Sequence, residues 1–201
     1  WIDGALDFSG RASATIMYRL FQNEVTAIGK TIEFEIETNN DLGQGEVFLS
    51  CMNGGRGIEI KSDRAILKSS DTTVITLFKE NEKIKISFVI DPYNGTTTTY
   101  INGVMSGIDR LSTQSAFKQA SPQTIAVNMS GIGGKLYNVR VYERALTYHE
   151  ILQNYLFDVT DISEKLYQYN FSDIYDSVGN ISIDKVKERI PVMVIRTYGA
   201  D

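Results

Sequence analysis

Three glutamates alternate along one short segment, Thr31-Ile32-Glu33-Phe34-Glu35-Ile36-Glu37. Alternate residues of a β-strand point to the same face, so the three carboxylates would form one row. Two carboxyl groups that flank a glycosidic bond can act as nucleophile and general acid. Neighbours in the row would lie about 6.6 Å apart along the strand, whereas retaining chemistry places its carboxyl groups about 5 to 5.5 Å apart. Side-chain freedom can close that gap, so the spacing alone leaves catalysis open.

We favour another interpretation of this row, in which the glutamates form the solvated, non-catalytic face of a half-buried strand. Ile32, Phe34 and Ile36 occupy the positions between them and would face a core. Clefts that cleave sugars usually carry aromatic platforms near their acids, whereas the single tryptophan of this chain is Trp1. We therefore expect no catalytic residue and no enzyme. A glycoside hydrolase that uses the glutamate row is kept as an alternative.

Other catalytic constellations are not supported by the residue types. His149 is the single histidine, and we expect it on the surface of a helix. A Ser-His-Asp triad would have to use it, and no Gly-x-Ser-x-Gly elbow is present. Cys51 follows an apolar run and is expected to be a small buried hydrophobe. No CxxC or HExxH spacing indicates zinc.

Binding is a better hypothesis than catalysis. Sugars are held by flat aromatic faces and by planar amide or guanidinium groups that match paired hydroxyls. Several predicted turns and strand ends carry such groups, although each of them is also an ordinary surface residue type. The ligand-binding candidates are Tyr18, Arg19, Asn53, Arg56, Tyr93, Asn94 and Arg110.

Calcium is left open as a ligand, and no cofactor is required. Ca²⁺ takes six to eight oxygens, and the acidic residues show no recognisable ligand spacing. Turn formation explains the aspartates equally well. The turn aspartates are Asp41, Asp63, Asp71, Asp91 and Asp109.

The elements that would position these residues are mostly strands. Short segments rich in Ile, Val, Thr, Phe and Tyr alternate with turns that contain Gly, Asn or Asp. Strands at intervals of about ten residues predict an antiparallel sandwich or barrel. The segments are 31–37, 47–49, 57–61, 73–78, 83–90, 97–101, 124–127 and 135–142.

One short helix is predicted after the last of these strands. Thr147 is a suitable N-cap, and Glu150 three residues later completes the spacing of a capping box. An apolar stripe at helical spacing then follows, formed by Ile151, Leu152, Tyr155 and Leu156. Such a short helix must dock on the sandwich to be stable.

Composition limits the class of protein. The 201 residues carry a net charge of −5, which argues against a nucleic-acid partner. No apolar run approaches the roughly 20 residues of a membrane span. A single cysteine permits no disulfide within the chain. The start at Trp1 without Met leads us to expect one piece of a larger modular protein.

We expect residues 1–157 to form the sandwich and residues 158–201 to form a connector with the first strand of a following module. Within the second segment, 162–169 has the composition of a short helix and 190–195 that of a strand. The alternative is that this strand returns to the same sandwich.

Three segments together resemble the LamG-like jelly-roll domains of the concanavalin A-like lectin/glucanase superfamily. Residues 4–10 resemble the first strand of that fold, and residues 86–103 resemble its central hairpin, which ends in a Tyr-x-Asn-Gly turn. Residues 134–147 resemble the closing strand that runs into the short helix. The resemblance implies an all-β, antiparallel jelly-roll β-sandwich over residues 1–157.

The resemblance also implies a range of functions, because function lies in sites placed on a fold. The glucanase branch carries a Glu-x-Asp-x-Glu type motif, and this chain has Glu35 at the central position. We expect a non-catalytic carbohydrate-binding or adhesion module of an extracellular bacterial surface protein or a phage tail on a virion. Its partners would be a glycan or cell-wall polysaccharide and neighbouring modules. A structural spacer or oligomerisation domain is the alternative.

Overall fold

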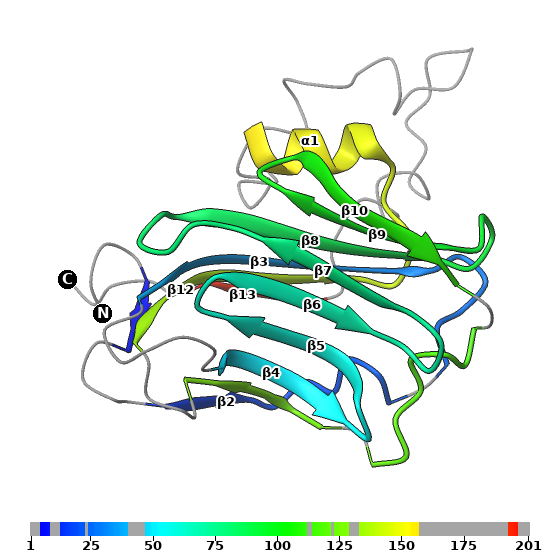
Figure 1. Ribbon diagram of the computed structural model, residues 1–201, viewed down its shortest axis with the longest axis horizontal. Coiled ribbons are helices and arrows are strands. Elements are labelled where there is room, and N and C mark those ends of the chain that lie inside the picture. Colours follow the sequence, from blue (N-terminus) through cyan, green and yellow to red (C-terminus); the bar gives the residue numbers. More distant parts are fainter. Residues whose placement is uncertain are drawn as a thin grey trace, which may run out of the picture.

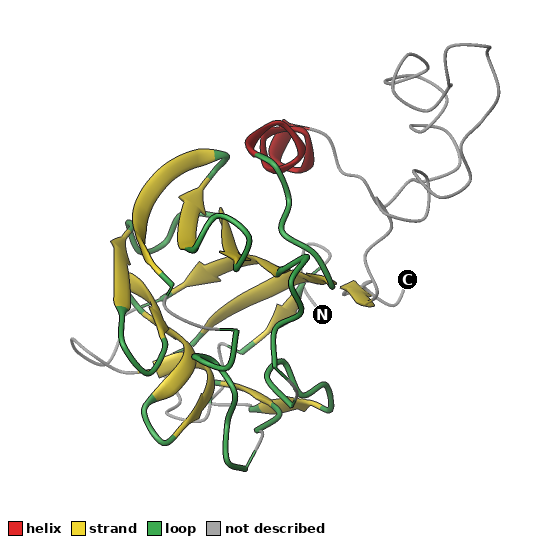
Figure 2. Ribbon diagram, turned by 90° about the vertical axis from the view of Figure 1, so that its right-hand side faces the viewer, coloured by secondary structure: helices red, strands yellow, loops and turns green. Residues whose placement is uncertain are grey.

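Two antiparallel sheets face each other across an apolar core, and one short helix lies outside the sandwich (Figures 1 and 2). This computed structural model describes residues 5–8, 13–22, 24–39, 47–111, 114–121, 123–128 and 133–156, together with the backbone of 193–196. The all-β sandwich that the alternating segments predict is confirmed.

The first sheet has the strand order β1-β12-β3-β8-β9-β10, and β13 pairs with β12 beyond the end of β1. Strand β3 lies between β12 and β8, with Phe34 opposite Val139 on one side and Ile86 on the other. The strands are β1 (Leu6–Asp7), β3 (Lys30–Thr38), β8 (Ile84–Asp91), β9 (Thr96–Ile101), β10 (Val104–Arg110), β12 (Gly134–Tyr142) and β13 (Met193–Arg196).

The second sheet has the strand order β2-β11-β4-β5-β6-β7. Its strands from β4 to β7 follow one another through tight turns, so neighbours in sequence are neighbours in the sheet (Figure 1). The strands are β2 (Ala14–Ile16), β4 (Val47–Asn53), β5 (Arg56–Lys61), β6 (Arg64–Lys68), β7 (Thr73–Leu77) and β11 (Ile125–Val127).

The core is built from the inward residues of both sheets, as strand alternation requires. Ile32, Phe34 and Ile36 of β3 are fully buried. The Phe34 ring meets the Phe88 ring edge to face, with centroids 6.2 Å apart. Phe48 of the second sheet meets Phe8 in the same manner at 5.9 Å. The apolar side of the β3 pattern therefore faces the core as the sequence predicts.

The two sheets approach each other at one pair of edges, formed by β7 and β10. The Thr72 hydroxyl, just before β7, donates a hydrogen bond to the Asp109 carboxylate of β10. Neither β6 nor β10 is among the strands that the sequence predicts. Strand β6 is short and has charged ends, and almost every residue of β10 is exposed, which removes the alternation of apolar and polar residues.

Helix α1 (Tyr148–Leu156) begins where the sequence predicts. The Thr147 N–H donates to Glu150 Oε2 at 2.9 Å, and the Glu150 N–H donates to Thr147 Oγ1 at 3.4 Å, which completes the capping box. Arg144 adds two bonds to the same carboxylate, at 2.9 and 2.7 Å. Ile151 is buried against the outer face of the first sheet, so the helix docks on the sandwich as expected.

The segment after α1 lies outside the described residues, except for the backbone of β13. The expected helix at 162–169 falls in that part. Strand β13 pairs antiparallel with β12, as the alternative of a strand returning to the sandwich would require. The division of the chain at residue 158 stays a prediction. In the part of the chain that the structure describes, no helix is long and apolar enough to cross a membrane.

The charge on Glu150 should contribute stability that depends on pH. Burial disfavours the charged carboxylate, but the bonds from Arg144 and Thr147 outweigh this effect and lower its pKa below the ordinary 4.5. The contribution is therefore complete well above pH 4.5 and is lost as the pH falls through the lowered value.

We expect Glu150→Gln to lower the free energy of unfolding by about 1 kcal/mol near neutral pH. The two proteins should converge as the pH falls below 4.5, in urea titrations at a series of pH values. Glu82→Gln removes an exposed carboxylate and is the control. A difference between Glu150→Gln and the natural chain that does not change with pH would contradict this account.

Candidate functional site

The glutamate row lies on the outer face of the first sheet, and its first member is buried beneath α1. Glu33 is only 2% exposed. Its carboxylate accepts hydrogen bonds from Ser87 Oγ and from Asn154 Nδ2, both at 3.0 Å, and lies 3.5 Å from Arg140 Nη1. Burial raises the pKa of Glu33, and the Arg140 charge opposes that shift. A substrate has no access to this carboxylate.

The other two glutamates of the row are also engaged. Glu35 pairs with Lys83 at 2.8 Å. Glu37 accepts a hydrogen bond from the Tyr137 hydroxyl at 3.0 Å and lies 3.8 Å from Lys135. The Lys83 ammonium stands 4.1 Å from the centre of the Tyr137 ring. The row is thus a ladder of ion pairs that supports the sheet. This corrects the expectation of a solvated face, since Glu33 is buried, and it argues against the hydrolase alternative, which needs accessible carboxylates.

The two other residues weighed as nucleophile or base have the structural positions that the sequence predicts. His149 is exposed on α1, where its ring lies 5.8 Å from that of Tyr148. Cys51 is fully buried in β4. Burial raises the pKa of its thiol to about 11, so the thiolate is scarce at neutral pH.

The described aspartates that the sequence places in turns are engaged by neighbouring side chains, but Asp109 lies in β10 and not in a turn, and its partner Thr72 comes from the other sheet. Among the described residues, no group of three or more His, Cys, Asp or Glu side chains has the arrangement of a metal site. Asp41 lies outside the described residues. The partners of the other four are Arg64 for Asp63, Ser69 for Asp71, Asn94 for Asp91, and Thr72 for Asp109.

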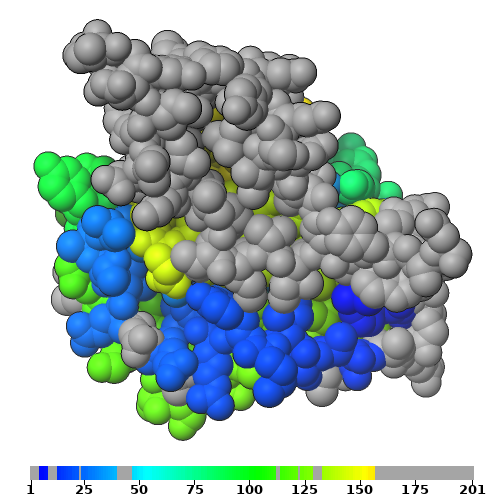
Figure 3. Space-filling view, turned by 180° about the vertical axis from the view of Figure 1, so that it is seen from behind, coloured from blue at the N-terminus to red at the C-terminus, as the bar shows by residue number. Residues whose placement is uncertain are grey.

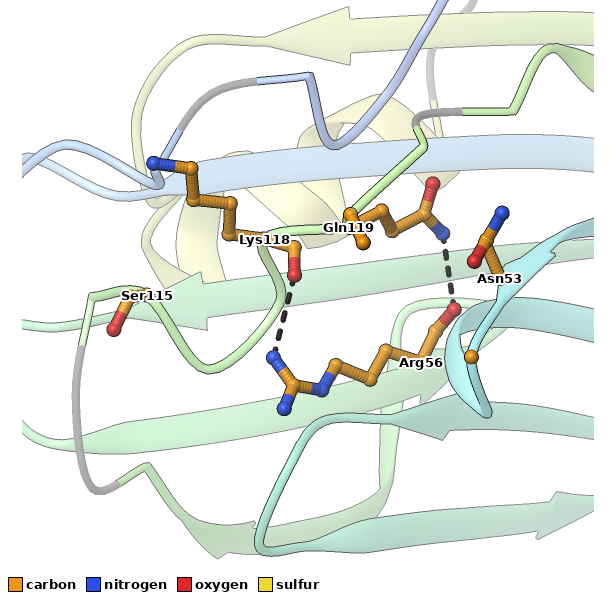
Figure 4. A pocket seen from close by; sticks show the side chains of 7 residues that line it. Asn53, Arg56, Ser115, Lys118 and Gln119 are labelled. Carbon is orange, nitrogen blue, oxygen red and sulfur yellow. Dashed lines mark hydrogen bonds between the residues drawn. The ribbon is translucent and has the colours of Figure 1, made fainter.

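A pocket of about 470 Å³ lies between the β4–β5 turn and the loop 114–121 (Figure 4). The loop belongs to the crossing from β10 in the first sheet to β11 in the second. Its apolar residues Ala116 and Phe117 are buried in the core, and this holds the polar residues beside them at the surface. The pocket is lined by Asn53, Gly54, Arg56, Ser115, Lys118, Gln119 and Ala120.

Gln119 fastens the loop to the hairpin. Its Nε2 donates to the carbonyl oxygens of Cys51 and Arg56, both at 2.9 Å, and its Oε1 accepts from the Gln123 N–H at 3.1 Å. The close approach depends on Gly57, whose φ is +125°. A Cβ at that position would lie 2.8 Å from the Gln119 Nε2 and would overlap the Cys51 carbonyl oxygen.

Two further bonds tie the rim of the pocket. Asn53 Nδ2 donates to the Ser121 carbonyl at 2.8 Å, and Arg56 Nη1 donates to the Lys118 carbonyl at 3.3 Å. Figure 4 shows the Arg56 side chain stretched along the loop toward Lys118 and Ser115, with Gln119 and Asn53 at the other end. The described residues of the lining include two cations and no carboxylate. They can therefore bind and orient a polar ligand, and they offer no acid–base pair for chemistry.

The structure brings two of the predicted binding residues, Asn53 and Arg56, together in this pocket. Three others lie around the β8–β9 turn. Tyr93 is 89% exposed there, Asn94 donates to the Asp91 carboxylate at 2.6 Å, and Arg110 is in register with Thr96 just after the turn. That these candidates bind a ligand stays a prediction.

Tyr18 and Arg19 belong to the N-terminal segment and do not line the pocket. The Tyr18 hydroxyl donates to Glu143 at 3.1 Å, and Glu143 also pairs with Lys30 at 3.0 Å. Burial, followed by the Glu143 charge, raises the pKa of Tyr18 to about 12. Figure 3 shows this back face, where N-terminal residues in blue lie against residues in yellow.

Sequence analysis missed Ser115, Lys118 and Gln119, although they form one side of the pocket. They lie in a connection with no apolar periodicity, and nothing in a glutamine's type distinguishes a buried brace from a surface residue. A partial signal is Gly57 inside a strand, since an isolated strand glycine indicates the close approach of another group.

Replacing Gln119 should destabilise the fold. The variant Gln119→Ala leaves the carbonyl oxygens of Cys51 and Arg56 without their side-chain donor, and we expect a loss of about 1 to 3 kcal/mol in the free energy of unfolding. Chemical denaturation measures it. Gln22→Ala, at an exposed glutamine, should change stability by less than about 0.5 kcal/mol. Equal effects of the two substitutions would refute the role of Gln119 as a brace.

Several solved binding domains have a similar fold. The binding domain of botulinum neurotoxin serotype D has a TM-score of 0.54 and 12% identity, over 74% of this chain and 40% of that chain. The binding domain of Paraclostridial Mosquitocidal Protein 1 has a TM-score of 0.50 and 18% identity, over 76% and 45%. The binding domain of botulinum neurotoxin DC in complex with SialylT has a TM-score of 0.50 and 15% identity, over 65% and 35%.

At these identities the similarity is one of fold, and this chain spans less than half the length of each of the three. Each of the three is described as a binding domain. Comparison with curated protein sequences gives no match. A family model described as the concanavalin A-like lectin/glucanases superfamily matches residues 19–152. The antiparallel sandwich and this match over most of the sequence show that the chain belongs to the concanavalin A-like lectin/glucanase superfamily.

Proposed function

We propose that the domain is a non-catalytic carbohydrate-binding module whose ligand occupies the pocket between the β4–β5 turn and residues 114–121. One observation carries the proposal: the pocket presents the Asn53 amide and the Arg56 guanidinium over a buried brace, Gln119. Planar amide and guanidinium groups match the paired hydroxyls of a sugar, and the brace fixes their spacing before a ligand arrives.

The size and the rigidity of the pocket support the same proposal. Its volume of about 470 Å³ falls within the range of about 300 to 1,000 Å³ that is usual for small-ligand sites. A site that is already formed loses less conformational entropy on binding. Among the structures of similar fold, the binding domain of botulinum neurotoxin DC was solved in complex with SialylT.

The described lining contains no aromatic ring, so stacking on a sugar face does not contribute there. Hydrogen bonds to hydroxyls exchange with water and contribute about 0.5 to 1.5 kcal/mol each. The ligand is therefore expected to bind weakly at a single site, and avidity would come from several copies of the module.

We also propose an extracellular setting, either a bacterial surface protein or a phage tail, in which the module works beside neighbouring modules. What supports this setting is that the similar folds are binding domains of toxins, that is, parts of larger proteins that must recognise a target.

A second candidate function is that of a spacer or oligomerisation domain. Five apolar side chains on the adjacent edge strands β7 and β10 are more than half exposed. Each of these strands pairs on one side only within the described residues. Contiguous exposed apolar surface often marks a protein interface. The five residues are Ile75, Leu77, Val104, Met105 and Ile108.

The carbohydrate-binding proposal predicts that Arg56→Ala weakens glycan binding while Arg64→Ala does not. Arg64 is the matched control because it lies at the opposite end of the β5–β6 hairpin and pairs with Asp63 at 2.6 Å. We expect Arg56→Ala to reduce the affinity for a glycan about tenfold, as the loss of one charged hydrogen bond would.

A glycan array identifies the ligand, and isothermal titration of the natural chain and both variants measures the affinities. Absence of binding to every polysaccharide and glycan by the folded domain would contradict the proposal. Equal losses of glycan affinity in the two variants would be consistent with a carbohydrate-binding module but would contradict this pocket as its binding site.

The spacer candidate predicts self-association through β7 and β10. In that case sedimentation equilibrium would show a dimer, and Ile108→Lys would convert it to a monomer with unchanged far-UV circular dichroism. A natural chain that sediments as a monomer at high concentration would exclude this candidate.

A further inference from the structure

The charge of the pocket differs from that of the whole chain. The chain carries a net charge of −5, whereas the part of the pocket lining that the structure describes contains Arg56 and Lys118 and no acidic residue. Arg56 forms no ion pair with a described residue, and its guanidinium donates to the neutral carbonyl of Lys118. One N–H of the guanidinium is used in this way, and a guanidinium carries five. Most of the N–H groups of the Arg56 guanidinium therefore remain available to a ligand.

Two lysines lie near the β4–β5 turn: Lys118 lines the pocket together with Arg56, and Lys68 approaches the tip of the turn. The Lys118 ammonium lies 3.6 Å from Glu24, with both side chains 53% exposed, so this pair is loose. Lys68, from the neighbouring strand β6, places its Nζ 3.7 Å from where a Cβ of Gly55 would be, at the tip of the β4–β5 turn. Three cationic side chains, Arg56, Lys68 and Lys118, thus lie near the β4–β5 turn. Among the described residues, Glu24 is the one carboxylate that pairs with any of them.

We propose that the pocket selects sugars that carry a carboxylate, with Arg56 as the residue that binds the acid group. This inference rests on the proposed carbohydrate-binding function. A guanidinium fork matches the two oxygens of a carboxylate with two parallel hydrogen bonds, whereas a hydroxyl pair receives weaker, neutral ones. The Asn53 amide at the same rim then reads a neighbouring hydroxyl.

The geometry favours an acidic sugar over an acidic peptide. The rim is narrow: Asn53 and Arg56 are separated in sequence by the two glycines of a tight turn, and the loop closes the other side through Gln119. The Arg56 guanidinium lies toward one end of this rim and Asn53 toward the other (Figure 4), an arrangement that suits a short sugar chain with its acid group on Arg56. No sheet edge is open at this place, since β4 and β5 are both paired on both sides.

The test compares two matched pairs of probes by isothermal titration: sialyl-lactose against lactose, and tetragalacturonate against its methyl ester. We expect the acidic member to bind about 10 to 100 times more tightly than its neutral partner. Arg56→Ala should abolish that preference, and Arg56→Lys should keep part of it. Arg64→Ala should keep all of it. Raising the salt from about 0.01 M to about 1 M should weaken the acidic probe, because the Debye length falls from about 30 Å to about 3 Å.

The outcomes separate this inference from the proposed function. Equal binding of the acidic and neutral members, or binding of neutral glycans only, overturns the inference and leaves the carbohydrate-binding module intact. Binding of neither pair, together with a silent glycan array, overturns both. If oligoglutamate bound as tightly as the acidic sugars, the pocket would recognise acidic peptides, and the proposed selectivity for acidic sugars would be overturned.

Discussion

The hydrogen bonds of one buried amide hold the candidate site together. Gln119 joins the β4 backbone, the β5 backbone and its own loop, because it donates to two carbonyl oxygens and accepts from one N–H. The loop crosses from one sheet to the other at this point, so the same amide that forms the floor of the pocket also fastens a connection between the two layers. Binding geometry and sandwich closure therefore depend on the same contacts.

The outer face of the first sheet shows how burial changes the meaning of a motif. The glutamates at 33, 35 and 37 repeat with identical spacing, yet α1 covers the first of them and leaves the others at the margin. Beneath the helix, Ser87, Arg140 and Asn154 surround Glu33 from three separate elements. A carboxylate in such a place orders the docking of the helix, because only the docked helix brings the Asn154 amide to it.

Much of the fold follows from local pattern. Alternation in β3 identifies both its core face and its polar face, and Thr147 with Glu150 locates the start of α1 to the residue. Strands β6 and β10 escape prediction because their neighbours, rather than their own sequences, make them strands.

The candidate site follows only in part. Asn53 and Arg56 can be named from residue type and a turn signal. Gln119 cannot be named in this way, because its role arises where segments more than 60 residues apart in sequence come within hydrogen-bond distance. Likewise, nothing local indicates that Glu33 would be covered by a helix that begins more than 100 residues later.

The tip of the β4–β5 turn offers a route to new ligand preferences. Gly54 lines the pocket with a φ of +55°, and a Cβ added there would meet no atom within 4 Å. Asparagine and aspartate tolerate this backbone conformation better than other residues with side chains. An amide or a carboxylate can thus be introduced at the mouth of the pocket while Gly57, Gln119 and the core beneath them stay untouched. The architecture separates the residue that can vary from the residues that cannot, which makes this hairpin tip a natural position for diversification by evolution or by design.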